Sequence, residues 1–377
     1  MGRWLPLSVN SDAIRAYVTE PPQGSGPGIL LYGGEEGFNE ALQKFAEQLG
    51  EEGYVVVAPD LANRPLTAEA EVAVAAAACD LLKTQPQHRG RIGGIGFGKG
   101  GDVVLRSLMK DYVACAAAYD PTEVENVTRL LTLGKSDIVI HRAAEGPNSA
   151  SVDLDVDSYN RPIVYTYPDV RVGFSQPGSE AWNEVASSLA YSRSLTLLRS
   201  VIGPRFNLEA LWNAHRACEF VTRDAAATMK TMVAEPYVNH VPTMTGGFGQ
   251  RDLHRFYRDF FIPTNPSDMR NIPISQTVGA DRVVNEGILC FTHDRRIDWL
   301  LPGVEPTGKY VEVALVGIIT FRGGKLVHEH IYWDQASVLV QIGLLDPKGL
   351  PVCGAEAAQK VRDPSLPANH LLPDWND

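Results

Sequence analysis

The sequence predicts two domains of different fold classes: an α/β domain with a mainly parallel sheet, followed by an α+β domain with a curved antiparallel sheet. Three observations lead to this prediction. The chain has 377 residues, which is more than a single hydrophobic core usually holds. Its first half alternates strand patterns with helical patterns, whereas helical patterns are followed by long β-rich runs in its second half. Gly203 and Pro204 separate two helical patterns, so we place the boundary there.

Composition excludes several classes of protein. The formal net charge is -11 and no long basic run offsets it, which argues against a nucleic-acid partner. The five cysteines are scattered without a CxxC pair, as expected for reduced thiols in a cytoplasmic protein without a zinc site. The chain shows no signal-peptide core and no apolar run of about 18 residues, so we expect no membrane contact.

Strand patterns and helical patterns alternate regularly through the first half of the chain. Each β-branched or glycine-bounded apolar run is followed by a helical pattern, which is typical of parallel strands with helices on both faces. We expect strands at 28–34, 54–60, 91–97 and 113–119, and helices at 39–52, 67–84 and after residue 99.

The glycine-rich turn at 94–101 allows three interpretations. The spacing of Gly96, Gly98 and Gly101 matches a dinucleotide fingerprint, which is a weak pattern on its own. A P-loop is nearly matched, but Gly100 stands where a serine or threonine holds magnesium. The third interpretation is a nucleophile elbow, in which a strained strand-to-helix turn lifts one side chain above the sheet.

Four segments favour the elbow: ILLYGGEEGFNE, GYVVVAPDL, IGGIGFGKGG and YTYPDVRVGFSQPGSEAW. In their order and spacing they resemble the dienelactone hydrolase family of α/β-hydrolases. The resemblance implies a cysteine or serine at the elbow with a histidine and an acid. Here Gly98 stands at the nucleophile position and Val172 at the histidine position, with the acid near Glu145, while Glu35 and Glu36 fall in the oxyanion region. Because nucleophile and base act as one unit, we expect domain 1–202 to be silent as a hydrolase.

The second half reads as helices followed by a strand meander. We expect helices at 208–233 and 250–261, with Asp224 as a cap and Pro236 as the end of the first pair. Strands follow at 274–278, 281–292, 309–321 and 326–334, and a short helix closes the domain at 338–345. This gives a domain at 203–345 and a proline-containing, extended tail at 346–377.

The last strand carries an unusual face. His328, His330, Tyr332 and Asp334 alternate with Val327, Glu329, Ile331 and Trp333, so the two sets point to opposite faces. A face with two imidazoles, a phenol and a carboxylate either meets water or lines a polar cavity. We predict that it lines a cavity in which the chemistry takes place.

A second resemblance rests on YVNHVP, THDRRIDWLLPGVEPTGK, FRGGKLVHEHIYWD and VLVQIGLL. In this order they look like the SnoaL-like polyketide cyclases of the nuclear-transport-factor-2-like superfamily. The resemblance implies a cone-shaped fold around a deep pocket, and a carboxylate that removes a proton next to a carbonyl without a cofactor. It also implies a mid-sized oxygenated small-molecule substrate and a possible homodimer formed through the sheet.

Proton abstraction needs a base shielded from water and a donor to the developing enolate oxygen. The candidate catalytic residues are Asp298, Asp334, His330, Arg296 and Tyr237, and the candidate substrate-binding residues are Asn239, His240, His293 and Tyr332. The spacing of His293, Asp294 and His330 matches no metal motif, so we expect no metal or other cofactor.

Structural roles for some of these residues, and a rival function, stand as alternatives. Asp334 is also placed to cap the following helix, and Arg296 with Asp298 is also placed to form a structural ion pair. The limonene-epoxide hydrolases, which the chain resembles through Arg296-Ile-Asp298 and Tyr237-Val-Asn239, imply epoxide hydrolysis as the rival reaction. The alternative from another class is a binding or scaffold protein with two silent domains.

Overall fold

The computed structural model describes residues 2–9, 12–34, 37–61, 67–123, 126, 129–130, 132–145 and 163–375. Two compact units divide the chain, Met1–Phe206 and Asn207–Asp377, and each is considered by itself. The pair Glu35 and Glu36, expected near an oxyanion region, and the side chain of Glu145, expected near the acid position, lie outside the described residues.

The first unit is built on an eight-stranded sheet in the order β1-β2-β4-β3-β5-β6-β7-β8. The pairs β1–β2 and β2–β4 are antiparallel, and every other neighbouring pair is parallel, as the alternating pattern predicts. The strands are β1 (Arg3–Val9), β2 (Asp12–Thr19), β3 (Gly26–Tyr32), β4 (Val55–Pro59), β5 (His88–Phe97), β6 (Ala116–Tyr119), β7 (Ile138–Glu145) and β8 (Ile163–Arg171).

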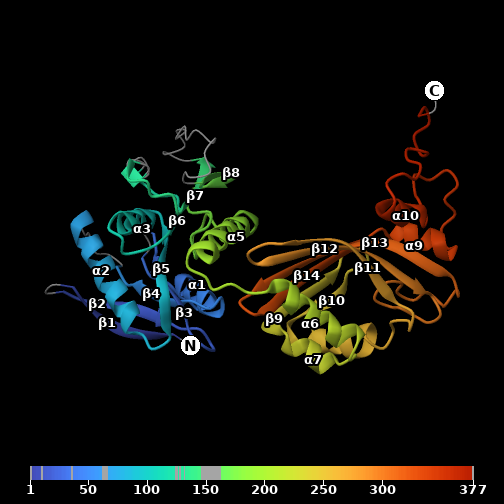
Figure 1. Cartoon of the computed structure of the whole chain (residues 1–377), viewed down its shortest axis with the longest axis horizontal. Coiled ribbons are helices and arrows are strands. Elements are labelled where there is room, and N and C mark those ends of the chain that lie inside the picture. Colours follow the sequence, from blue (N-terminus) through green and yellow to red (C-terminus); the bar gives the residue numbers. More distant parts are fainter. Residues whose placement is uncertain are drawn as a thin grey trace. The chain divides into compact units, whose positions relative to one another are not determined.

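Helices cover both faces of this sheet (Figure 1). They are α1 (Glu40–Glu51), α2 (Ala68–Thr84), α3 (Lys99–Met109) and α5 (Glu184–Val201). Neighbouring glycines of β5 illustrate the two faces, because a Cβ on Gly93 would meet α5 and one on Gly94 would meet Val104 of α3. Side-chain caps begin three of the helices: Asn39, Thr67 and Asn183 each accept from the backbone N–H three residues later.

The second unit contains a six-stranded sheet in the order β10-β9-β14-β13-β12-β11. Only β14 and β9 pair in parallel, and the other pairs are antiparallel, so the predicted meander is confirmed. The strands are β9 (Met232–His240), β10 (Thr245–Phe248), β11 (Arg270–Val278), β12 (Arg282–Thr292), β13 (Tyr310–Arg322) and β14 (Lys325–Trp333).

The helices of this unit are α6 (Leu208–Phe220), α7 (Ala225–Lys230), α8 (Gly249–Phe256), the π-helical turn η1 (Tyr257–Phe261), α9 (Gln335–Ile342) and α10 (Glu356–Arg362). In Figure 1, α6 and α7 lie against the curved sheet. Asp224 caps α7 as predicted, accepting from Ala227 N–H at 3.0 Å. The prediction that Pro236 ends the helix pair is wrong, because α7 ends at Lys230 and Pro236 lies within β9.

The segment expected to be an extended tail contains α10, whose Ala358 packs against Ile288 and Cys290 of β12. All five cysteines are free thiols. Within the described ranges, no helix has both the length and the apolar character that crossing a membrane requires.

Candidate active site

The turn between β5 and α3 has the backbone of a nucleophile elbow. Gly98 adopts φ 51° and ψ -124°, a conformation that L side chains rarely adopt. A Cβ on Gly98 would find space, since its nearest neighbour is the Gly34 Cα at 3.7 Å. A Cβ on Gly96 would come within 2.1 Å of the Gly100 carbonyl oxygen. The glycine at 96 is therefore needed for close packing, whereas the glycine at 98 removes the side chain that would attack.

The elbow opens onto a cavity of about 300 Å³. Val172 lines this cavity at the predicted histidine position and is 48% exposed. Asp120 also lines it, but its carboxylate accepts from the N–H groups of Ala143 and Gly173 at 2.8 and 3.0 Å, which is a structural task. Among the described lining residues there is neither a cysteine nor a histidine.

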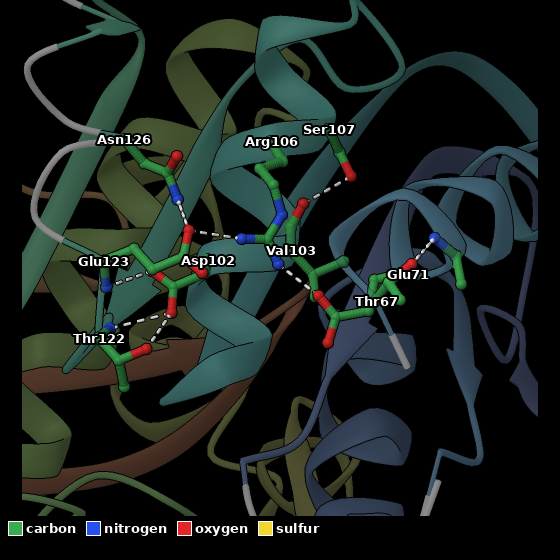
Figure 2. A network of polar contacts seen from close by, with 10 residues as sticks. Thr67, Glu71, Asp102, Val103, Arg106, Ser107, Thr122, Glu123 and Asn126 are labelled. Carbon is green, nitrogen blue, oxygen red and sulfur yellow. Dashed lines mark hydrogen bonds and ion pairs between the residues drawn. The ribbon is translucent and has the colours of Figure 1, made fainter. Parts of the chain in front are cut away.

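A polar network behind the elbow holds the neighbouring loop in place (Figure 2). Asp102 of α3 is buried and accepts from Thr122 N–H and Oγ1 at 3.0 and 2.6 Å and from Glu123 N–H at 2.9 Å. Arg106, one turn further along, donates to both Glu71 and Glu123. The hydrolase frame is thus well supported although its nucleophile is absent.

The second unit encloses a cavity of about 80 Å³ between α6 and the inner face of the sheet. Its wall is mostly apolar and aromatic, with a small number of polar side chains, as is common for ligand sites. The lining residues are Trp212, Arg216, Glu219, Phe220, Val238, His240, Tyr257, Phe261, Asn271, Asn285, Leu289, Trp299, Leu315, Gly317, Glu329 and Ile331.

A buried ionisable cluster forms one wall of the cavity. Trp212, His215 and Glu219 follow one another at helical spacing on α6 and are all buried, so they share a face of the helix. Glu329 of β14 meets them from the sheet. His215 Nε2 lies 3.2 Å from a Glu219 oxygen and 3.1 Å from a Glu329 oxygen, and the Tyr257 hydroxyl donates to Glu329 at 3.4 Å.

The second nitrogen of His215 fixes its tautomer. His215 Nδ1 lies 2.6 Å from Thr231 Oγ1, and the Thr231 hydroxyl donates its proton to the Thr228 carbonyl at 2.6 Å. The Thr231 oxygen must therefore accept from Nδ1–H. Nε2 is left to face the two carboxylates.

Burial and charge oppose each other in this cluster. Burial alone would lower the pKa of His215, but the charges of Glu219 and Glu329 outweigh it and raise that pKa to about 10. Burial raises the pKa of the Glu219 carboxyl against the opposing charge of His215. On the neighbouring strand β9, burial lowers the pKa of His240 to about 4, which keeps this imidazole neutral near pH 7.

Two further polar atoms in the wall lack protein partners. Trp212 Nε1 and Asn271 Oδ1 are buried without a hydrogen bond, and both residues line the cavity. Unsatisfied buried polar atoms are costly. A donor and an acceptor left open on one cavity are suited to a ligand that carries an acceptor and a donor of its own.

The predicted site residues largely lie elsewhere. The two sets of residues on the last strand lie on opposite faces as predicted, but this cavity is lined from the other face: Glu329, Ile331 and Trp333 are buried, and Glu329 and Ile331 line the cavity. His330 stands on the opposite face, where its ring lies 5.6 Å from that of Tyr237. Of the nine candidates, only His240 lines this cavity.

The remaining candidates have structural contacts. Asp334 caps α9, accepting from the Ala336 and Ser337 N–H groups. Arg296 pairs with Asp298 at 3.2 Å outside the cavity wall. His293 is buried with Nδ1 3.2 Å from Thr307 Oγ1. The side chains of Tyr237 and Tyr332 are 37% and 41% exposed, and Asn239 is half-buried without lining the cavity.

Sequence reasoning missed His215, Glu219, Glu329 and Tyr257. A signal was present, because Leu208, Trp212, His215 and Glu219 fall at successive helical steps on one face of α6. Two ionisable side chains on a face that begins with leucine and tryptophan indicate a polar group facing the core. Glu329 carries the matching signal in β14, between Val327 and Ile331.

Comparisons with known proteins agree with this architecture. The dienelactone hydrolase family pattern matches residues 64–202, and the SnoaL-like domain pattern matches residues 214–329, a range that contains His215, Glu219 and Glu329. The first unit is therefore an α/β-hydrolase-type domain and the second a SnoaL-like domain.

A protein of Saccharomyces cerevisiae named "Putative carboxymethylenebutenolidase" is 30% identical over 189 residues, which cover 40% of this chain and 68% of that protein. The chain belongs to the dienelactone hydrolase family. Similar solved structures include a dienelactone hydrolase-like promiscuous phosphotriesterase from metagenomic libraries, which is 14% identical with a TM-score of 0.44 and covers 54% of this chain and 99% of that one. Another is a dienelactone hydrolase from Anabaena variabilis, which is 16% identical with a TM-score of 0.41 and the same coverage.

Both predicted family resemblances are thus confirmed. They support an enzyme role of the hydrolase or isomerase type acting on a small molecule.

Proposed function

We propose that the SnoaL-like domain catalyses a proton transfer at a carbon next to a carbonyl group, as in a cyclisation, isomerisation or elimination. The observation that carries this proposal is the placement of a carboxylate, Glu329, and an unpaired N–H donor, Trp212 Nε1, on the wall of one largely apolar cavity. A base and an oxyanion donor are the two groups that such a reaction needs.

Each group has a role in the proposed step. The Glu329 carboxylate takes the proton from carbon, and the electron pair of the C–H bond moves into the carbonyl, giving an enolate. Trp212 Nε1–H donates to the enolate oxygen. His215, held between Glu219 and Glu329, balances carboxylate charge before the step, and Tyr257 keeps Glu329 in position through its hydrogen bond. Return of the proton to another carbon, or loss of a leaving group, completes the reaction.

Hydrogen exchange at carbon tests this step with simple carbonyl compounds in place of the natural substrate. The full chain is incubated in D₂O with a panel of small ketones, hydroxyketones and 1,3-dicarbonyl compounds, and loss of the α-proton signal is followed by NMR. We expect Glu329→Gln to slow exchange by about 100- to 10,000-fold. Trp212→Phe, which removes the donor and keeps the aromatic ring, is expected to slow exchange by about 100- to 1,000-fold.

Matched variants separate this proposal from the site inferred from sequence. Asp298→Asn and Asp334→Asn change carboxylates that do not line the cavity, so exchange is expected to continue at the parent rate. If these two variants lose exchange while Glu329→Gln keeps it, the base belongs to the sequence-predicted set and the present proposal is wrong.

Hydrolysis is the second candidate, because the dienelactone hydrolase family supplies the first unit. Gly98 at the elbow and Val172 in the wall of the same cavity oppose triad chemistry there. Epoxide hydrolysis through Arg296 and Asp298 is disfavoured by their position outside the cavity wall. Incorporation of oxygen-18 from water into a product would support hydrolysis, whereas deuterium at carbon without oxygen-18 would support proton transfer.

A further inference from the structure

We propose that His215, Glu219 and Glu329 form a binding site for one divalent transition-metal ion. One ligand atom from each of the three residues lies within 4.8 Å of the other two, and all three residues are buried. Imidazole and carboxylate are ligands that Zn²⁺, Co²⁺ and Mn²⁺ accept in proteins. The ion would bind the same residues to which we assigned proton transfer above, and in this choice of site the inference rests on the proposed function.

The first argument is geometric. Two ligand atoms that share one ion at about 2.1 Å and a tetrahedral angle lie about 3.4 Å apart. His215 Nε2 lies 3.2 and 3.1 Å from the two carboxylate oxygens. Despite these short distances, Nε2 makes no hydrogen bond of acceptable geometry to either oxygen, so this buried nitrogen has no hydrogen-bond partner. It is aimed between the carboxylates, as it would be toward an ion shared by all three.

The second argument comes from the support behind the ligands. Metal-binding histidines usually donate their other ring N–H to a fixed acceptor, which sets the tautomer. His215 Nδ1–H donates to Thr231 Oγ1, whose own proton is committed to the Thr228 carbonyl. Nε2 therefore presents its lone pair whenever the ring is neutral. Tyr257 in turn donates to Glu329.

The third argument is charge. A carboxylate in a buried wall is costly unless a positive charge accompanies it, and a divalent ion would bring that charge to both Glu219 and Glu329, which are buried. Glu219 and Glu329 reach the cavity surface, so the ion would keep positions open toward the cavity. A carboxylate bound to an ion holds a proton less tightly, so we expect the bound ion to slow the proposed proton transfer.

The experiment titrates Co²⁺ into the full chain after treatment with a chelator, follows visible absorption, and displaces Co²⁺ with Zn²⁺ or Mg²⁺. We expect one Co²⁺ per chain, displaced by Zn²⁺ in preference to Mg²⁺ because a nitrogen ligand is present. Glu219→Gln is expected to weaken binding by more than about 100-fold. Thr231→Val, which removes only the acceptor for Nδ1–H, is expected to weaken it by about 10- to 100-fold.

A surface group supplies the control. Cys353, Glu356 and His370 also bring ligand atoms within 4.8 Å of one another, but Glu356 and His370 are exposed. The double variant Cys353→Ser, His370→Gln is expected to keep the Co²⁺ spectrum. The inference is overturned if this variant abolishes binding, if Glu219→Gln leaves affinity unchanged, or if no ion binds at millimolar concentration.

The two proposals fail separately. If the metal-free chain exchanges α-protons and binds no ion, the metal inference is wrong and the proton-transfer proposal stands. If the ion binds at the three residues and no compound of the panel exchanges, the metal site stands and the proposed function does not.

Discussion

The strained turn at Gly98 gives a prediction whose size follows from the backbone. Replacing Gly98 by alanine adds a Cβ at φ 51°, with no atom closer than 3.7 Å, so the cost is conformational and not steric. An L residue in such a region costs about 1–3 kcal/mol. For a unit of this size, about 1 kcal/mol shifts Tm by roughly 2–4 °C. Gly98→Ala is therefore expected to lower the Tm of the first unit by roughly 2–12 °C.

Scanning calorimetry of the full chain measures this shift, and Gly96→Ala serves as the comparison. At Gly96 the added Cβ would stand 2.1 Å from the Gly100 carbonyl oxygen, so the start of α3 must move and a larger loss is expected. Gly98→Ser is expected to cost about as much as Gly98→Ala and to give no ester hydrolysis, because Val172 supplies no base. A Gly98→Ala protein as stable as the parent would refute the assigned strain, and ester turnover by Gly98→Ser would refute the claim that the elbow is silent.

Three further predictions concern stability. Asp334→Ala removes the α9 cap and is expected to cost about 0.5–2 kcal/mol by urea unfolding, whereas Asp334→Ser, which keeps a cap, is expected to cost less. Glu52→Gln leaves buried Arg199, which lies 2.5 Å from Glu52, without its charge partner and is expected to cost about 3–5 kcal/mol; a loss below about 1 kcal/mol would contradict that pairing. Burial lowers the pKa of His141 to about 3, below its unfolded value of about 6.5. The contribution of the neutral imidazole to the free energy of unfolding is therefore fully present above about pH 6.5 and is lost as the pH falls toward 3. Between about pH 3 and 6.5 the free energy of unfolding is expected to change less steeply with pH in His141→Gln than in the parent chain. An unchanged slope would contradict the lowered pKa of His141.

Much of the fold could be predicted from local patterns. Alternating apolar strands and helical stretches indicated the parallel sheet, and the segments that resemble the dienelactone hydrolase family favoured a nucleophile elbow at Gly98 over two other interpretations of the same glycines. The helix cap at Asp224 follows from its residue type at the start of a periodic run. These features depend on neighbours in the sequence, which is why sequence reasoning reaches them.

The cavity-lining face of β14 could not be decided in this way. A strand has two faces with the same period, and alternation alone does not say which one is buried. Polar residues such as His328 and His330 drew attention to one face, but the other carries Ile331 and Trp333. Burying a large apolar side chain contributes about 1.5–3 kcal/mol, which turned that face, and Glu329 with it, toward the cavity.

By itself, the sequence determined that this chain joins two enzyme-type folds and that the first has lost its nucleophile, since both depend on residue types in order along the chain. Only the tertiary structure brought together the residues on which the proposed acid/base chemistry depends. His215 and Glu329 lie on a helix and a strand far apart in sequence, and they meet because the curved sheet brings Glu329 of β14 against the face of α6 that carries His215.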